Sequence, residues 1–107
     1  MDKKLLSSAI DNHALLSSAQ KKVLKTLLYL SVDGTVAVTA KYLERHCKIC
    51  LNTVYFSLIK LQKDGYITQF GTTPRKKAFS LSLSKLEYLQ KANQAQEILE
   101  RSFYEVS

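Results

Sequence analysis

Apolar residues recur with a helical period soon after the start of the chain. Ser17 or Ser18 can cap a helix there, because a serine hydroxyl accepts a hydrogen bond from a free backbone N–H group. The apolar positions that follow make one broad stripe and predict a single buried face; they are Val23, Leu24, Leu27, Leu28 and Leu30. Asp33-Gly34 then ends the helix, and the β-branched run at residues 35–39 predicts a short strand at the edge of a small sheet.

Two shorter amphipathic stretches follow, separated by a tight polar break. Thr39 is a good N-cap for the first, and the second runs from about residue 51 to residue 63, where Asp64-Gly65 stops it. The helical spacing predicts the side chains that face inward, which are Ala40, Leu43 and Cys47 in the first stretch and Val54, Leu58 and Leu61 in the second. Two helices with so short a break predict a helix-turn-helix.

Residues 66–70 and 78–83 are predicted strands on either side of a basic loop. Ile67 with Thr68, and Phe79 with Ser80, show the alternation of apolar and polar residues expected of a strand with one buried face. The residues between them, 71–77, contain a glycine, a proline and three cations, which is typical of an exposed hairpin tip. We call residues 71–77 the wing loop.

Residues 84–106 predict a long C-terminal helix. Ser84 can cap it, with Glu87 three residues later in a capping box. A stripe at alternating spacings of four and three indicates a partner helix; it consists of Tyr88, Ala92, Ala95, Leu99, Ser102 and Val106, with Phe103 beside it. The predicted dimer-interface residues are Tyr88, Ala92, Ala95, Leu99 and Phe103. The alternative is that this helix packs on its own domain.

The chain is therefore predicted to be mainly α-helical with a small β-hairpin. Its 107 residues, 46% of them hydrophobic, suffice for one compact core. We expect one domain at residues 18–83, an N-terminal extension or additional helix at residues 1–17, and the C-terminal helix at residues 84–107.

Positive charge is concentrated in the predicted domain. The net charge is +7, and residues 20–50 and 51–84 each contribute +4, whereas the N-terminal 19 residues are neutral and the C-terminal helix carries −1. Lys and Arg displace counterions from phosphates, so this distribution favours a nucleic-acid partner. A basic surface that serves solubility alone is the alternative.

The run ICLNTVYFSLIKLQKDGYI, residues 49–67, resembles the turn, recognition helix and first wing strand of the winged helix-turn-helix superfamily. The family pattern has a small N-cap residue, a Thr-Val-Tyr segment, a Leu-x-x-Leu core pair and a closing glycine. The resemblance covers about residues 18–83 and implies a DNA-binding fold. Three residues depart from the pattern: Lys48 stands where glycine is common, Cys50 where serine usually caps, and Phe56 where a cation often meets DNA.

The face of the 51–63 helix opposite its buried stripe is the predicted reading face. Asn52 can pair with adenine, and Phe56 can pack on a thymine methyl group or, alternatively, under the wing loop. Lys60 and Lys63 are expected to meet phosphates. The predicted DNA contacts of this helix are Asn52, Thr53, Phe56, Ser57, Lys60 and Lys63. An ordinary solvated helix face is the alternative.

The wing loop contains several side chains that can donate hydrogen bonds to DNA phosphates. In winged proteins such a tip follows the DNA backbone or enters the minor groove, where arginine is favoured if the groove is narrow. The predicted contacts are Thr72, Thr73, Arg75, Lys76 and Lys77. A solubilising loop, or a guard against edge-to-edge pairing of strands, is the alternative.

Cys47 and Cys50 form a C-x-x-C motif beside His46. Its spacing matches half of a zinc site, but the chain has no second cysteine pair, and its only other histidine is His13. Cys47 already belongs to an apolar stripe, where a free cysteine behaves as a small hydrophobe. We therefore expect structural thiols, no metal and no cofactor, with a thiol or metal switch as the alternative.

These patterns predict a sequence-specific protein that binds double-stranded DNA as a homodimer, as a transcriptional regulator does. No nucleophile elbow, glycine-rich phosphate loop or metalloprotease helix is present, so an enzyme and a catalytic site are not expected. The sequence also lacks an apolar run of roughly 20 residues and a secretory signal pattern, so we expect a cytoplasmic, nucleoid-associated protein. A plasmid or viral replication or partition protein, and a winged-helix protein-interaction module, remain alternatives.

Overall fold

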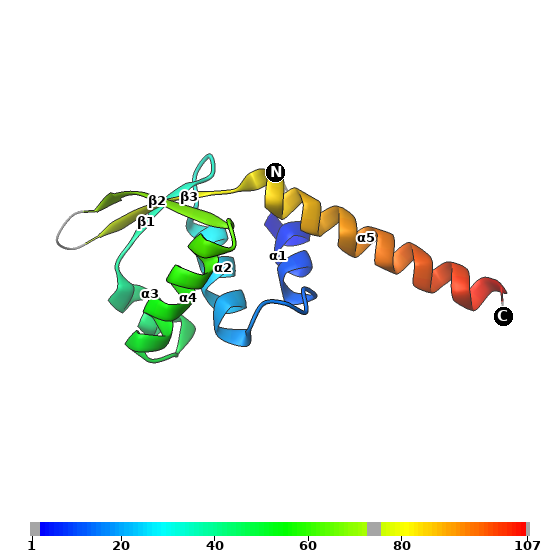
Figure 1. Cartoon of the computed structure of the whole chain (residues 1–107), viewed down its shortest axis with the longest axis horizontal. Helices are drawn as coiled ribbons and strands as arrows, with labels where there is room; N and C mark the ends of the chain where they lie inside the picture. Colours follow the sequence, from blue (N-terminus) through cyan, green and yellow to red (C-terminus); the bar gives the residue numbers. More distant parts are fainter. Residues whose placement is uncertain (1–2, 73–75, 107) are drawn as a thin grey trace.

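Five helices and a three-stranded sheet make up the described fold (Figure 1). The computed structural model describes residues 3–72 and 76–106, with the backbone alone at residues 72, 93 and 96–106. The elements are α1 (Lys3–Asp11), α2 (Ser18–Leu30), β1 (Thr35–Val38), α3 (Ala40–Cys47), α4 (Leu51–Lys63), β2 (Ile67–Thr72), β3 (Lys77–Leu81) and α5 (Leu83–Val106). This order confirms the predicted helix-turn-helix with a hairpin and a long final helix.

The ends of α2 show how far local signals determine an element. Ser17 is the N-cap, and it forms a capping box with Gln20. The helix ends at Leu30, so the prediction that Asp33-Gly34 ends it was wrong. Lys3 Nζ donates hydrogen bonds to the carbonyl oxygens of Tyr29 and Ser31, at 3.0 and 2.8 Å, and satisfies acceptors that the helix end leaves free.

Asp33 and Gly34 form a tight turn and do not end α2. Asp33 and Gly34 both adopt positive φ, 54° and 79°, and reverse the chain between Val32 and Thr35. This turn delivers the chain into β1, which is an edge strand as predicted because the sheet order is β1-β3-β2.

The helix-turn-helix follows its sequence signals closely. The Thr39 side chain accepts a hydrogen bond from the Tyr42 N–H group, 3.0 Å away, and so caps α3. Lys48 takes the left-handed conformation, with φ 55° and ψ 45°, that the family pattern assigns to glycine. Cys50 occupies the N-cap position of α4 without a side-chain capping hydrogen bond. The turn therefore forms in spite of the departures at these two positions.

The hairpin is antiparallel and slightly irregular. β2 reaches from Ile67 to Thr72 and β3 begins at Lys77, so the strands extend into the segment predicted as the wing loop. The register shifts between Gln69 and Gly71, which leaves Phe70 as an extra, bulged residue.

The N-terminal segment is a helix, and its role is to anchor α5. α1 packs against both α2 and α5, and it buries Leu6 and Ile10 in the core to which Leu86 and Leu89 of α5 also belong. α5 begins at Leu83, so the predicted cap at Ser84 was wrong. The reason is tertiary: the Ser82 N–H group donates to Tyr66 O, which holds the chain at the sheet, and the Ser82 carbonyl accepts from Leu86. Beyond α1, α5 extends away from the rest of the fold (Figure 1).

Candidate nucleic-acid interface

The outward face of α4 exposes side chains suited to reading DNA. Asn52, Lys60 and Lys63 are exposed as predicted. Phe56 is 73% exposed, so the alternative that it packs under the wing loop is wrong. Thr53 is half-buried, and its hydroxyl lies 3.0 Å from the thiol of Cys50.

Ser57 does not belong to this face. Its exposed fraction is 4%, so its prediction as a DNA contact was wrong. At roughly 100° per residue, position 57 is rotated about 100° from Phe56, toward the side of α4 that packs on α2. It lies near the start of α2, where Ser57, Ser17 and Ala19 line one shallow hollow.

Tyr55 and Ile59 are two members of the exposed surface that the sequence analysis missed. Ile59 is 61% exposed and Tyr55 39% exposed. A helical wheel holds the signal that could have found Ile59, because it lies three residues from Phe56 and four from Lys63, on one face. Its residue type alone gives no such signal, because isoleucine is more often buried than exposed.

The loop end of the hairpin, where Lys77 pairs with Thr72, lies beside α4. Lys77 Nζ sits 4.7 Å from the centre of the Tyr55 ring, which is a cation–π contact between β3 and α4. This contact places one of the predicted wing cations next to the reading face. Lys76 is also exposed, whereas Thr73 and Arg75 lie outside the described residues, as does the side chain of Thr72.

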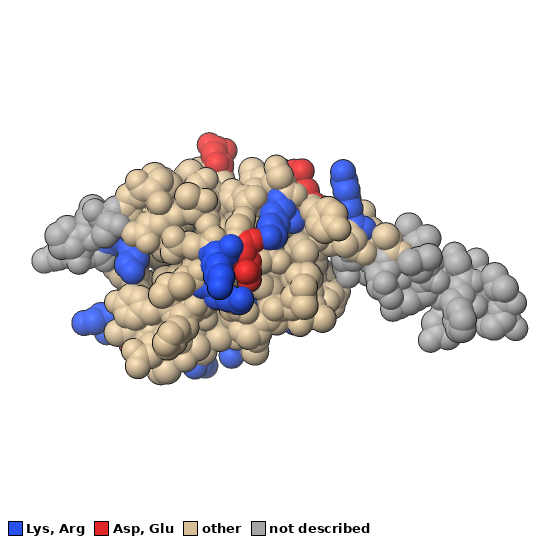
Figure 2. Space-filling view, in the orientation of Figure 1, with Lys and Arg blue, Asp and Glu red and all other residues tan. Residues whose placement is uncertain are grey.

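The charged residues of α4 are all positive. The helix contains no Asp or Glu, and the nearest carboxylate, Asp64 at its C-cap, lies 3.8 Å from Lys60 Nζ. In the space-filling view, basic and acidic groups meet near the end of α4, and most of the surrounding surface is uncharged (Figure 2). The reading face thus combines a largely neutral centre with cations at its edges.

The two thiols of the C-x-x-C motif lie in different surroundings. Cys47 is buried as predicted, and its sulfur lies 3.5 Å from the Thr26 hydroxyl. Cys50 is exposed, and a hydrogen bond with the Thr53 hydroxyl lowers the pKa of its thiol, helped by the backbone N–H of Thr53. The cysteines form no disulfide.

Each of the two histidine rings contacts a tyrosine ring. His46 stacks on Tyr42, and His13 meets Tyr66 edge to face, with ring centres 5.6 and 6.4 Å apart respectively. Within residues 3–72 and 76–106, no three His, Cys, Asp or Glu side chains form a group that could hold a metal ion. Over the same part of the chain, no helix has both the length and the apolar character needed to cross a bilayer.

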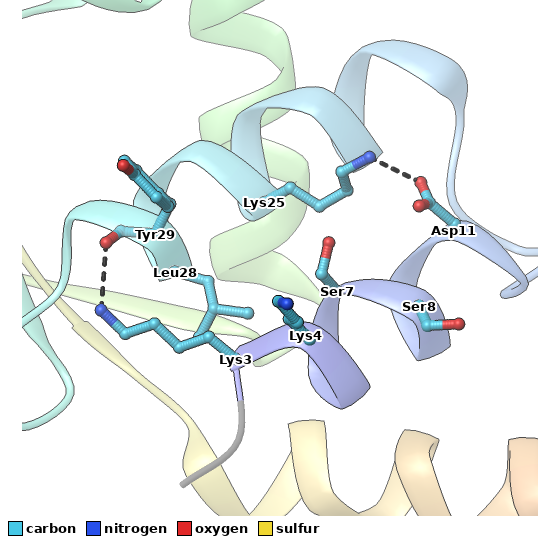
Figure 3. Close-up of a pocket in the computed structure, with 8 residues that line it drawn as sticks. All are labelled: Lys3, Lys4, Ser7, Ser8, Asp11, Lys25, Leu28 and Tyr29. Atoms are coloured by element: carbon cyan, nitrogen blue, oxygen red, sulfur yellow. Dashed lines mark hydrogen bonds and ion pairs between the residues drawn. The ribbon is translucent and has the colours of Figure 1, made fainter.

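A hollow of about 360 Å³ is lined by residues of both α1 and α2 (Figure 3). Its polar groups fasten the two helices together: Lys25 Nζ pairs with an Asp11 carboxylate oxygen 2.8 Å away, and Lys3 bonds to the end of α2. No residue of α4 lines it, so the hollow is separate from the reading face.

The described members of the predicted dimer stripe are exposed on α5, where Tyr88 and Ala92 line a hollow with Ala9 and Leu15. Tyr88 is 71% exposed, and Ala92 and Ala95 are also exposed, whereas Leu86 and Leu89 face the core. The start of α5 therefore packs on its own domain through a different face from the predicted stripe. The side chains of Leu99 and Phe103 lie outside the described ones.

Comparison with known proteins identifies the fold. No protein-family description and no curated protein matches the sequence. Among solved structures, a possible transcriptional regulator from Methanosarcina mazei Go1 matches with a TM-score of 0.56 at 16% identity, over 97% of this chain and 84% of that one. MepR, a transcription regulator of the Staphylococcus aureus multidrug efflux pump MepA, matches with a TM-score of 0.58 at 15% identity, over 98% and 75%. NadR in complex with 4-hydroxyphenylacetate matches with a TM-score of 0.52 at 16% identity, over 97% and 79%.

These likenesses extend over nearly the whole chain, α1 and α5 included. At such low identity they establish the fold and nothing finer. The chain has the winged helix-turn-helix fold, and its structural neighbours include transcription regulators.

Proposed function

We propose that this winged helix-turn-helix protein binds double-stranded DNA in a sequence-specific manner and regulates transcription as a homodimer. The observation that carries the proposal is the outward face of α4, where Asn52, Phe56 and Lys60 are exposed together on a helix without carboxylates. A helix of this kind fits the major groove of B-DNA, which is wide enough to admit it.

The position of each group suits a separate task. Asn52, in the first turn of α4, can make a bidentate contact with adenine. Lys60 and Lys63 in the last turns of α4, and Lys77 at the loop end of the hairpin, can meet phosphates on either side of the groove. Base contacts then supply sequence preference, and phosphate contacts supply most of the affinity.

The homodimer part of the proposal is supported by the geometry of α5. The helix extends beyond the domain (Figure 1). Tyr88, Ala92 and Ala95 are exposed along it. Pairing through this stripe would present two copies of α4 to one duplex. Two recognition helices about 34 Å apart can read two half-sites one helical turn apart.

Selection of bound fragments from a library of the source genome, followed by footprinting, tests the proposal. We expect enrichment of a sequence with two related half-sites, protected over about two turns of DNA. An operator upstream of a gene supports transcriptional regulation, whereas tandem half-sites at an origin would show a replication or partition protein instead.

Exposed apolar residues on α4 and β2 favour one alternative function. Ile59 and the bulged Phe70, which is 62% exposed, would also suit a winged domain that binds an acidic protein. A chain that retains no fragment above background, and binds random duplex with negligible affinity at 50 mM salt, would support this alternative.

A further inference from the structure

The centre of the reading face on α4 is apolar, which is unusual for a surface offered to DNA. Phe56 and Ile59 are both more than half exposed. Together with Tyr55, one residue before Phe56 and four before Ile59, they form an apolar ridge on α4. The aromatic ring of Tyr55 is fixed beside Lys77. Phe56 and Ile59 have no comparable cover among the described residues, so they are presented to a partner.

The charges around the ridge indicate what that partner is. Lys60 and Lys63 flank it on α4, and Lys77 flanks it from β3, while α4 itself carries no carboxylate. A surface that pairs cations at its edges with an apolar centre complements a groove whose edges are phosphates and whose floor carries methyl groups. In the major groove of unmodified DNA, only thymine offers a methyl group, at C5.

We infer that Phe56 and Ile59 read thymine methyl groups, so that the preferred half-site holds thymines at two nearby positions. This inference rests on the proposed DNA-binding function and names the bases that α4 selects. Side chains three apart on a helix lie about 5–6 Å from each other at Cβ, which corresponds to one or two base steps at roughly 3.4 Å each. Asn52, one turn before Phe56, would then pair with an adenine in the same A·T-rich stretch.

Replacement of thymine by uracil removes the C5 methyl group and leaves the hydrogen-bonding pattern of the base pair unchanged. We would enrich a random 24-base-pair duplex library for binding to the full chain, and then amplify the enriched pool once with dTTP and once with dUTP. The ratio of the two dissociation constants, measured by fluorescence anisotropy at one salt concentration, reports the contribution of the methyl groups.

The wild-type chain is expected to bind the thymine pool more tightly, by about fourfold for one buried methyl group and about fifteenfold for two. Uracil also alters the shape of the groove, which affects the wild type and the variants alike. The decisive comparison is therefore between the ratio of the wild type and the ratios of the variants. Phe56→Ala, Ile59→Ala and the double variant should bind the uracil pool as the wild type does, and the double variant should show a ratio within about twofold of one. Leu15→Ala, which shortens an equally exposed apolar side chain outside α4, should keep the wild-type ratio.

Equal binding of the wild-type chain to both pools would overturn the inference while leaving DNA binding intact. A thymine preference that persists in the double variant would also overturn it, because the preference would then come from DNA shape or from other residues. Failure of the library to enrich at all would refute the proposed function itself. Because Phe56 and Ile59 are exposed, circular dichroism should show that the variants are folded. If the double variant binds too weakly for a measurement, the two single variants report the ratio.

Discussion

At the scale of single residues, the N-cap of α4 carries an exposed thiol, that of Cys50. Cys50 is exposed, and the hydrogen bond with Thr53 holds the pKa of its thiol below the ordinary value of 9.0. The thiolate is the nucleophile, so a lowered pKa increases the reactive fraction at neutral pH. We predict that the rate of alkylation by iodoacetamide rises with pH through a midpoint below that of an unperturbed cysteine in a short peptide.

Thr53→Val removes the hydroxyl and should move this midpoint upward. Cys50→Ser serves as the control for Cys47, whose buried sulfur should react far more slowly than that of Cys50. A midpoint that does not respond to Thr53→Val would show that the hydroxyl has no effect on the thiol.

Asn52 is the residue on α4 best suited to a specific hydrogen-bonded contact. It is exposed in the first turn, where the helix approaches the base edges. We predict that Asn52→Ala loses about 1–3 kcal/mol of discrimination between the selected site and random DNA, with nonspecific binding nearly unchanged. Competition binding with both duplexes measures this difference. An equal loss on both would instead assign Asn52 to the DNA backbone.

At the scale of elements, the hairpin is predicted to contribute affinity rather than specificity. Lys77 begins β3 beside Tyr55, and the wing loop carries Arg75 and Lys76. Replacement of all three by alanine should weaken binding to every duplex and reduce the slope of log affinity against log salt by about 0.9 for each phosphate contact removed. A salt titration measures the slope. Lys91→Ala, an exposed cation on α5, should leave it unchanged.

At the scale of the whole molecule, α5 is predicted to set the oligomeric state. A charge placed in the stripe by Leu99→Glu should cost several kcal/mol at a buried helix interface unless it finds a partner. We therefore expect a monomer that stays folded, because the core of Leu27, Leu43, Val54, Leu58 and Leu61 is independent of that end of the helix. Light scattering at micromolar concentration, together with circular dichroism, tests both parts.

Leu86→Ala provides the contrasting variant. Leu86 lies in the core where α5 meets α1, so its truncation should lower the free energy of unfolding by about 2–5 kcal/mol. A Leu99→Glu chain that remains dimeric, or a wild-type monomer, would remove the support for a two-fold arrangement on DNA.

The sequence by itself determined the features that depend on near neighbours in the chain. The cap at Thr39 and the bounds of α4 were predictable, because each depends on hydrogen bonds and backbone geometry within about four residues. For Lys48 only the resemblance to a family with glycine at this position gave a signal. The period of the apolar residues also predicted the buried stripe of α4. Together these were enough for the helix-turn-helix and for the exposure of Asn52, Phe56 and Lys60.

Only the tertiary structure decided which boundary positions of a helix are covered. Ser57 is buried because α2 packs on its side of α4. In the same way, Lys3 helps to end α2 and Ser82 holds the start of α5 through bonds to residues far away in the sequence. A residue at the edge of an apolar stripe is buried or free according to the segment packed beside it, and that segment is chosen by the core as a whole.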